Sequence, residues 1–282
     1  MAGGVAVAFA PQLAMSVNPN KLNKYADDDK YFFEQKLDGV RLVIVVDNGN
    51  VIGWNRSGNQ ITLGPILIEA LERLNGRWVF DGEWIGETMW CFDVPELNGA
   101  GKNISTDNPY HQRREVLEAI APILESQTQN AFRLLPTYRT SDEKKKLVAM
   151  CKSNNAEGIM VKQKDARYWK GKRSPDCLKA KFVETVDCIV TKVGREGKRS
   201  VAIALFDGAK LIDVGACTVT DKILATVKVG DVIEVKYLYA TAERKVYQPS
   251  FLKIRDDRTP ESCMIEQLKF GNKEVLGTWD HI

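Results

Sequence analysis

The first half of the chain alternates between apolar runs of strand length and amphipathic stretches of helical length. The segments 31–34, 40–46 and 51–55 are rich in β-branched and aromatic residues, which favour extended backbone. Asn48-Gly49 separates the second from the third, and both residues tolerate the positive φ of a tight hairpin turn. The pattern therefore predicts three consecutive strands, the second with an entirely apolar core.

Three longer stretches show helical periodicity. Residues 65–75 carry apolar side chains three and four apart, begin with Pro and are followed by Gly76. Residues near 109–126 repeat this stripe, and a third helix is predicted over 141–153 with Ser141 as its cap. The side chains of the third helix that are expected to face inward are Leu147, Met150 and Cys151.

After Phe182 short β-rich runs replace the helical pattern. Asp207-Gly208 is a hairpin signal between two of these runs, and a short helical piece lies near 221–227. Five strands in roughly 100 residues are typical of a small barrel such as the OB-fold. The sequence thus predicts an α+β domain of antiparallel sheets and helices over 1–183, a short hinge near 182–186 and an OB-fold barrel over 184–282. The runs taken as strands are 187–193, 200–206, 210–214, 231–239 and 246–254.

Amino-acid composition narrows the possible class of protein only slightly. A hydrophobic content of 44% and a charged content of 27% are ordinary for a globular protein, and a net charge of +3 is too small to indicate nucleic-acid binding. Six scattered cysteines without a C-x-x-C pair and only two histidines argue against a zinc site and predict free thiols. Residues 1–16 lack the basic start of a signal peptide, and no apolar run reaches membrane-spanning length. We therefore expect a cytoplasmic protein.

The most informative chemistry is a lysine at the end of a strand. Lys36 is followed by Asp38-Gly39 and by Arg41, so its amine can be fixed in place and aimed at a phosphate. Nucleophilic attack needs the neutral amine, which nearby cations would favour. The alternative is a surface hairpin with a stray lysine, and by itself the segment is suggestive of a nucleophile.

Two acidic residues and a pair of lysines later in the sequence add to the chemistry of Lys36. Glu83 and Glu157 each lie beside a glycine next to a predicted strand, where carboxylates are suitable ligands for Mg²⁺ near phosphate. Lys179 and Lys181 alternate along a strand, so their ammonium groups point to one face. Taken singly, each of these is more often a solvent-exposed group.

In this order the segments resemble the covalent nucleotidyltransferase superfamily of ATP-dependent DNA ligases, RNA ligases and mRNA capping enzymes. KLDGVR (36–41), DGE (81–83), WCFD (90–93), EGIMVK (157–162) and LKAK (178–181) are similar to its motifs I, III, IIIa, IV and V. The resemblance implies an ATP-grasp-like adenylation domain in which Lys36 forms a covalent bond to AMP. It also implies Glu83 and Glu157 as ligands of Mg²⁺ or Mn²⁺. The ATP- or AMP-binding residues that it implies are Glu34, Gln35, Arg41, Phe92, Lys162, Lys179 and Lys181.

Further resemblances point to DNA. Residues 55–58 are similar to a Ser-Arg-Asn-Gly segment whose Arg holds the 5′-phosphate of a nick, although Asn55 departs from that pattern. The clusters 167–173, which interleaves aromatics with cations, and 192–199 would neutralise phosphates without reading sequence. Residues 255–258 resemble motif VI, which assists the departure of pyrophosphate. The implied DNA-binding residues are Asp38, Arg56, Lys170, Lys172 and Arg173, and those of motif VI are Arg255, Asp257 and Arg258.

The resemblance predicts a small two-domain ATP-dependent DNA ligase of the viral or bacterial type. Such an enzyme would seal nicks in duplex DNA as a monomer, without an obligate protein partner. Residues 11–14 resemble the lead-in of these ligases, and 35 residues before Lys36 leave no room for an N-terminal DNA-binding domain. A GTP-dependent capping guanylyltransferase, an RNA ligase and a non-catalytic nucleic-acid-binding protein remain alternatives, because the choice of purine cannot be read from these motifs.

Overall fold

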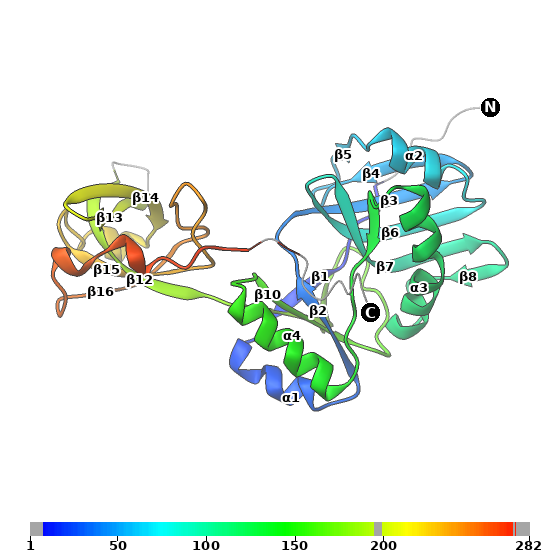
Figure 1. Ribbon diagram of the computed structural model, residues 1–282, viewed down its shortest axis with the longest axis horizontal. Coiled ribbons are helices and arrows are strands. Elements are labelled where there is room, and N and C mark those ends of the chain that lie inside the picture. The colour runs from blue at the N-terminus through cyan, green and yellow to red at the C-terminus, as the bar shows by residue number, and fades with distance from the viewer. Residues whose placement is uncertain (1–7, 195–198, 273, 275–282) are drawn as a thin grey trace. The chain divides into compact units, whose positions relative to one another are not determined.

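The protein is described by a computed structural model that covers residues 8–194, 199–272 and 274. It divides into two compact units (Figure 1). The first holds Gly158–Ala180, Glu274 and the described residues up to Cys151, and the second holds Lys152–Glu157 and the described residues from Lys181 to Asn272. Residues 1–7, Arg195, Lys198 and His281, which entered the sequence-based predictions, lie outside the described residues.

The larger sheet of the first unit has seven strands. They are β3 (Val40–Asp47), β4 (Asn50–Trp54), β5 (Gln60–Ile61), β6 (Arg77–Ile85), β7 (Thr88–Gly99), β8 (Lys102–Ile104) and β9 (Phe132–Leu134). The order is β5-β4-β3-β6-β7-β8, with β9 paired parallel to β7 and the other pairs antiparallel. The three predicted strands are β2 (Tyr31–Lys36), β3 and β4, and the predicted hairpin joins β3 to β4 through Asn48 and Gly49, whose φ angles are 48° and 85°.

The two faces of this sheet have different roles. Leu42 and Ile44 of β3 and Trp78 and Phe80 of β6 share a core with residues of α2 (Pro65–Leu71) and α3 (Tyr110–Gln127). These helices lie beside the larger sheet in Figure 1. Val43, Val45 and Val79 face the opposite side, where Phe9 and Tyr168 cover them. Burial on both faces explains why the run from 42 to 46 is entirely apolar. Side chains alternate along a strand, so Arg41, Asp81 and Glu83 lie on the face opposite the helices.

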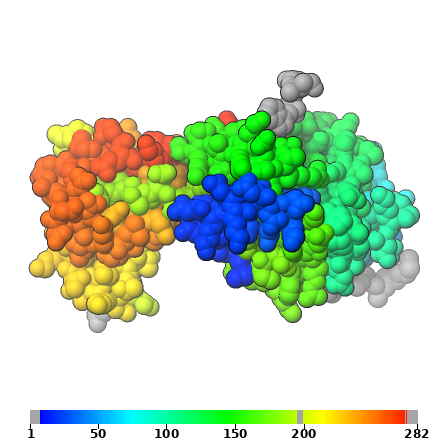
Figure 2. Space-filling view, turned by 90° about the horizontal axis from the view of Figure 1, so that it is seen from below, coloured from blue at the N-terminus to red at the C-terminus, as the bar shows by residue number. Residues whose placement is uncertain are grey.

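The second sheet of this unit has the order β1-β11-β10-β2. Its strands are β1 (Leu13–Ser16), β2 (Tyr31–Lys36), β10 (Gly158–Gln163) and β11 (Arg173–Lys181). The short helices η1 (Pro19–Lys21) and α1 (Leu22–Ala26) and the longer α4 (Ser141–Ser153) accompany it, with α1 and α4 side by side at the surface (Figures 1 and 2). None of the helices in the described ranges is both long and apolar enough to cross a membrane.

The start of α4 corrects one prediction. Thr140, not Ser141, caps the helix: its hydroxyl accepts the Glu143 N–H at 3.3 Å, and its own N–H donates to the Glu143 carboxylate at 2.9 Å. This reciprocal pair is a capping box. Met150, which was expected to be buried, is only partly buried, whereas Lys144 is buried and its ammonium donates to the carbonyl of Asp28 at 2.8 Å.

The second unit is built around five strands that close into a barrel in the order β12-β13-β14-β16-β15. They are β12 (Glu184–Val193), β13 (Ser200–Asp207), β14 (Lys210–Thr218), β15 (Val232–Tyr237) and β16 (Ser250–Ile254). The helices are α5 (Asp221–Leu224), η2 (Pro260–Ser262) and η3 (Ile265–Gln267). The Asp207-Gly208 hairpin is confirmed, but the last strand begins at Ser250 rather than at Val246, which makes only an isolated bridge to Ala240. All six cysteines are buried free thiols, as predicted.

Candidate active site

Lys36 is the last residue of β2 and lies opposite Gly158 of β10. The turn that follows runs close beneath β6, because a Cβ added at Gly39 would lie 2.3 Å from the carbonyl oxygen of Trp84. Only glycine permits this approach. The Gly of the motif thus fixes the turn that carries Lys36 against the larger sheet.

Arg41 projects from β3 toward Asp81 of β6. Its Nε and Nη2 donate to the two carboxylate oxygens of Asp81, each at 2.5 Å, and Asp81 is completely buried. Burial alone would lower the pKa of Arg41, but the negative charge and hydrogen bonds of Asp81 outweigh it and hold this pKa above its ordinary value. The guanidinium also lies 4.9 Å from the centroid of the Phe92 ring. Arg41 is therefore a fully charged, firmly oriented cation beside an aromatic face.

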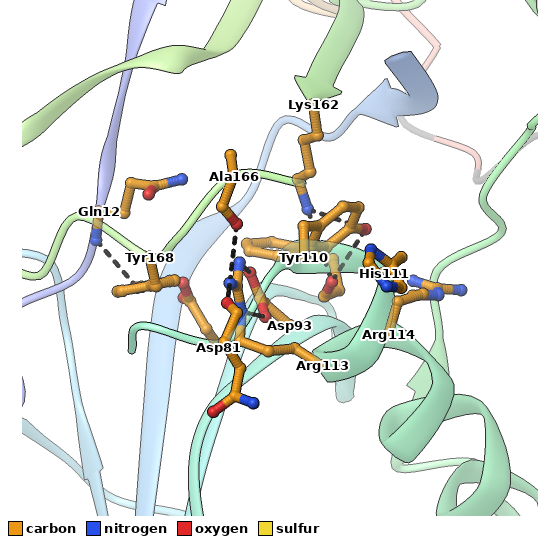
Figure 3. A network of polar contacts seen from close by, with 12 residues as sticks. Gln12, Asp81, Asp93, Tyr110, His111, Arg113, Arg114, Lys162, Ala166 and Tyr168 are labelled. Atoms are coloured by element: carbon orange, nitrogen blue, oxygen red, sulfur yellow. Dashed lines mark hydrogen bonds and ion pairs between the residues drawn. The ribbon is translucent and has the colours of Figure 1, made fainter. Parts of the chain in front are cut away.

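Tyr168 and Gln12 complete this cluster (Figure 3). The Tyr168 hydroxyl donates to Asp81 Oδ2 at 2.6 Å and accepts the backbone N–H of Gln12 at 2.9 Å. The side-chain oxygen of Gln12 accepts the N–H of Trp169 at 2.7 Å, and its carbonyl oxygen accepts Arg41 Nη2 at 3.3 Å. The lead-in segment is thus tied to motifs I and III. Tyr168 is only 3% exposed, so it does not belong to the DNA-facing aromatics with which the sequence grouped it.

A buried ion pair lies behind Tyr168. Arg113 of α3 donates from Nε and Nη2 to Asp93 at 2.8 and 2.9 Å, and from Nη1 to the carbonyls of Asn108 and Ala166 at 2.6 and 3.1 Å. Burial would lower the pKa of Arg113, but Asp93 raises it above the ordinary value. Arg113 thereby connects α3, β7 and the loop that leads to Tyr168 (Figure 3).

Glu34 and Lys162 form a second buried pair, with 2.7 Å between carboxylate and ammonium. Glu34 also accepts hydrogen bonds from the hydroxyls of Tyr110 and of Thr137, the latter at 3.0 Å. The Lys162 ammonium lies 4.5 Å from the centroid of Phe92, and although burial lowers its pKa, Glu34 raises it above the ordinary value. Phe92 is therefore approached by two cations, Arg41 and Lys162.

The two candidate metal ligands are carboxylates, of which Glu157 is buried and Glu83 is half-buried. Glu83 pairs in register with Arg41, and its pKa is raised by burial, partly offset by the charges of Arg41 and Lys36. Glu157 immediately precedes β10, is 5% exposed and lies 2.9 Å from the ammonium of Lys181. Within the described ranges no group of three or more metal-binding side chains occurs. Mg²⁺ at phosphates is commonly held by one or two carboxylates plus phosphate oxygens, and each of these two carboxylates by itself offers such hard oxygen donors.

Comparison with known proteins identifies the surrounding segment. Residues 87–181 match the model of the ATP dependent DNA ligase domain. Over these residues the chain is similar to an ATP-dependent DNA ligase domain. The matched segment holds Phe92, Glu157, Lys162, Lys179 and Lys181, whereas Lys36 precedes it.

Among curated relatives, DNA ligase 4 of Candida glabrata is 27% identical over 74% of this chain and 27% of its own length. The multifunctional non-homologous end joining DNA repair protein LigD of Mycobacterium tuberculosis is 24% identical over 84% of this chain and 38% of its own length. The chain thus spans well under half of these relatives.

The fold is shared with solved structures. The ligase domain of M. tuberculosis LigD has a TM-score of 0.52 and 21% identity, covering 91% of this chain and 98% of that one. A structure of a Lig E DNA ligase, described as binding DNA with a minimal scaffold, has a TM-score of 0.64 and 19% identity, covering 87% of this chain and 99% of that one. These likenesses concern the fold.

The remaining candidate residues of the ligase domain lie around this core. Gln35 is buried and donates to the carbonyl of Glu274 at 2.7 Å, and Lys179 lies in register with Ser16. Asp38 is half-buried in the turn after Lys36. Lys170 is 3.1 Å from Glu96, while Lys172 and Arg173 are exposed.

Arg56 is exposed on a tight turn that Asn55 organises. The side-chain oxygen of Asn55 accepts the N–H groups of Ser57 and Asn59, each at 2.9 Å. This explains why Asn is favourable at a position where the sequence departs from the family pattern.

In the second unit, Arg255 is held by carboxylates. It donates to Asp187 at 3.1 Å and to Asp257 at 2.7 Å, whereas Arg258 is half exposed, at 52%. The pKa of Asp257 is lowered to about 2, chiefly by its hydrogen bond with Arg255.

The sequence did not single out Asp81, Asp93, Arg113 or Tyr168 for roles in the site. Asp81 and Asp93 stand inside recognised motifs, so their positions were available. The burial of Arg113 could also have been predicted, because it lies four residues before Leu117 on the apolar stripe of α3. A charged residue at such a position must be paired. Nothing in the sequence distinguishes Tyr168 from its exposed neighbours.

Proposed function

We propose that this chain is an ATP-dependent DNA ligase that seals 3′-hydroxyl/5′-phosphate nicks in duplex DNA. The observation that carries the proposal is that Arg41 and Glu83 are register partners on β3 and β6, beside the turn that follows Lys36. Arg41 and Lys36 are close enough to Glu83 for their charges to act on its pKa. A nucleophile, a cation that contacts the nucleotide and a metal ligand are groups that nucleotidyl transfer requires. The ligase-domain match supplies the reaction class.

The proposed chemistry has three steps. Neutral Lys36 Nζ attacks the α-phosphorus of ATP, a nitrogen–phosphorus bond forms, the bond to pyrophosphate breaks, and the amine loses a proton. The 5′-phosphate oxygen of the nick then attacks the same phosphorus and releases Lys36. Finally the 3′-hydroxyl attacks the 5′-phosphate and AMP leaves.

The side chains around the nucleotide divide the binding task. We place Glu34, Gln35, Arg41 and Phe92 at the nucleoside, and Lys162, Lys179 and Lys181 at the phosphates. The fixed positive charges of the lysines and of Arg41 stabilise the negative charge that shifts between oxygens during the reaction. Such stabilisation is the main contribution in phosphoryl-type transfer. Mg²⁺ or Mn²⁺, when bound by Glu83 and Glu157, would neutralise further phosphate charge.

For the second unit we propose an OB-fold over 184–282, after an adenylation domain over 1–183. Support comes from the strand order, in which the fifth strand lies between the third and the fourth, and from the helix α5 before the fourth strand. Arg255, Asp257 and Arg258 would assist pyrophosphate release. Exposed cations of the first unit would contact the DNA backbone: Arg56, Lys170, Lys172 and Arg173, with Asp38 near the nick. We propose that the protein acts as a cytoplasmic monomer.

The first test is labelling with α-³²P-ATP or α-³²P-GTP in the presence of Mg²⁺. We expect an acid-labile adduct from ATP only, lost in Lys36→Ala and retained in Lys24→Ala, which alters an exposed lysine on α1. Labelling from GTP would indicate a capping-type enzyme. Labelling of Lys36→Ala would exclude Lys36 as the nucleophile, and no labelling with either nucleotide would refute the proposed activity.

The nucleic-acid substrate needs its own measurement. Wild-type protein with ATP should join a labelled nicked DNA duplex and leave the same nick in an RNA duplex unjoined. Joining of RNA alone would move the assignment to an RNA ligase.

A further inference from the structure

We infer that Tyr168 is a positioning residue for Arg41, and that its hydroxyl sets the affinity of the site for ATP by orienting Asp81. The inference rests on the proposed function in one respect, namely that Arg41 contacts the bound nucleotide. Tyr168 itself touches Arg41 only through the carboxylate of Asp81.

The hydrogen bonds around Asp81 determine the direction of each proton. Asp81 Oδ2 accepts from Arg41 Nη2 at 2.5 Å and from the Tyr168 hydroxyl at 2.6 Å. The backbone N–H of Gln12 donates to the same hydroxyl at 2.9 Å, so the hydroxyl proton points to Asp81 (Figure 3). Burial and the charge of Asp81 raise the pKa of Tyr168 well above its ordinary value, so the phenol stays protonated.

This arrangement restricts Asp81 to one orientation. If Asp81 accepted hydrogen bonds from Arg41 alone, the carboxylate and the guanidinium could rotate together. The Tyr168 hydroxyl is a third donor from a separate loop, and it fixes the plane of the carboxylate. Two oxygens held at 2.5 Å from Nε and Nη2 then fix the plane of Arg41, which leaves its position beside the Phe92 ring defined.

The Tyr168 ring is anchored independently of its hydroxyl. Its backbone N–H donates to the carbonyl of Thr106 at 2.7 Å, and Phe9 packs against the ring with 5.8 Å between centroids. The Arg113 guanidinium lies 5.6 Å from the ring centroid. Removing the oxygen alone should therefore leave the ring in place, so Tyr168→Phe isolates the hydrogen bond.

The experiment measures equilibrium binding of ATP to the full-length chain with Lys36→Ala, which cannot form the adduct. Tyr168→Phe in this background should raise the Kd for ATP about tenfold, as expected for loss of a hydrogen bond to a charged group. Tyr25→Phe, on α1, removes the same atom from a half-buried tyrosine of the first unit and should leave the Kd unchanged.

A double-mutant cycle separates positioning from general loosening of the fold. If Tyr168 acts through Arg41, Tyr168→Phe should have no further effect on the Kd once Arg41→Ala is present. An unchanged Kd in Tyr168→Phe, or the same fold-loss with and without Arg41, would overturn the inference. Adduct formation by the wild-type chain is measured in parallel and tests the proposed function separately.

Discussion

The buried ion pair between Asp93 and Arg113 gives the sharpest stability prediction. Its side chains are only 3% and 2% exposed, and Asp93→Asn would remove the negative charge with little change of shape. Arg113 cannot lose its proton, so an unpaired charge would remain buried. Breaking such a pair by removing one partner typically costs about 3–5 kcal/mol. We expect about 3 kcal/mol here, since the Asn side-chain oxygen and the carbonyls of Asn108 and Ala166 still accept from the guanidinium.

Urea unfolding followed by tryptophan fluorescence measures this loss in the first unit. The tryptophans at 54, 78, 84, 90 and 169 all lie there, and none occurs between residues 181 and 272. The matched control is Glu69→Gln, which breaks an ion pair with Arg73 whose side chains are 67% and 61% exposed. The control should change the unfolding free energy by less than about 0.5 kcal/mol.

The outcome distinguishes an unpaired charge from lost packing. The double variant Asp93→Asn, Arg113→Met removes both charges, so it should be more stable than Asp93→Asn alone. A loss below about 1 kcal/mol in Asp93→Asn would refute the reasoning, because the pair would then be replaceable by solvent or by the backbone acceptors. A double variant less stable than the single one would show that packing by Arg113 dominates.

Two further predictions concern other ion pairs. Asp187→Asn should release Arg255 and slow the formation of the lysyl–AMP adduct, measured as the rate of pyrophosphate release; an unchanged rate in a folded variant would contradict a role for this pair. Burial would raise the pKa of Glu118, but hydrogen bonds from Arg114 and Arg139 outweigh it and lower this pKa below 4.5. The charged Glu118 carboxylate therefore stabilises the folded state fully above the pKa of 4.5 that this group has when unfolded. This stabilisation is lost as the pH falls through the lower pKa of the folded state. Glu118→Gln should accordingly flatten the acid side of the plot of unfolding free energy against pH, and an unaltered slope would show that these pairs do not form.

The sequence predicted local structure well wherever the cause is local. Asn48-Gly49 and Asp207-Gly208 supply the positive φ of a two-residue turn, so both hairpins were predicted and both occur. The apolar stripe of α3 fixed its type and extent. The cap of α4 was misplaced by one residue, because Thr140 and Ser141 are equally good caps and the reciprocal bond with Glu143 decides between them.

The sequence by itself also determined the order and spacing of the motifs that contain Lys36, Glu83 and Glu157, since each is a short segment whose residue types carry its chemistry. Only the tertiary structure decided what these motifs contact. Arg41 meets Asp81 across 40 residues and Asp81 meets Tyr168 across 87, because the register of β3 against β6 and the loop after β10 bring them together. Burial of that cluster then makes each partner necessary, since a charge removed from water must be paired, and no pattern along the chain specifies which distant residue will pair with it.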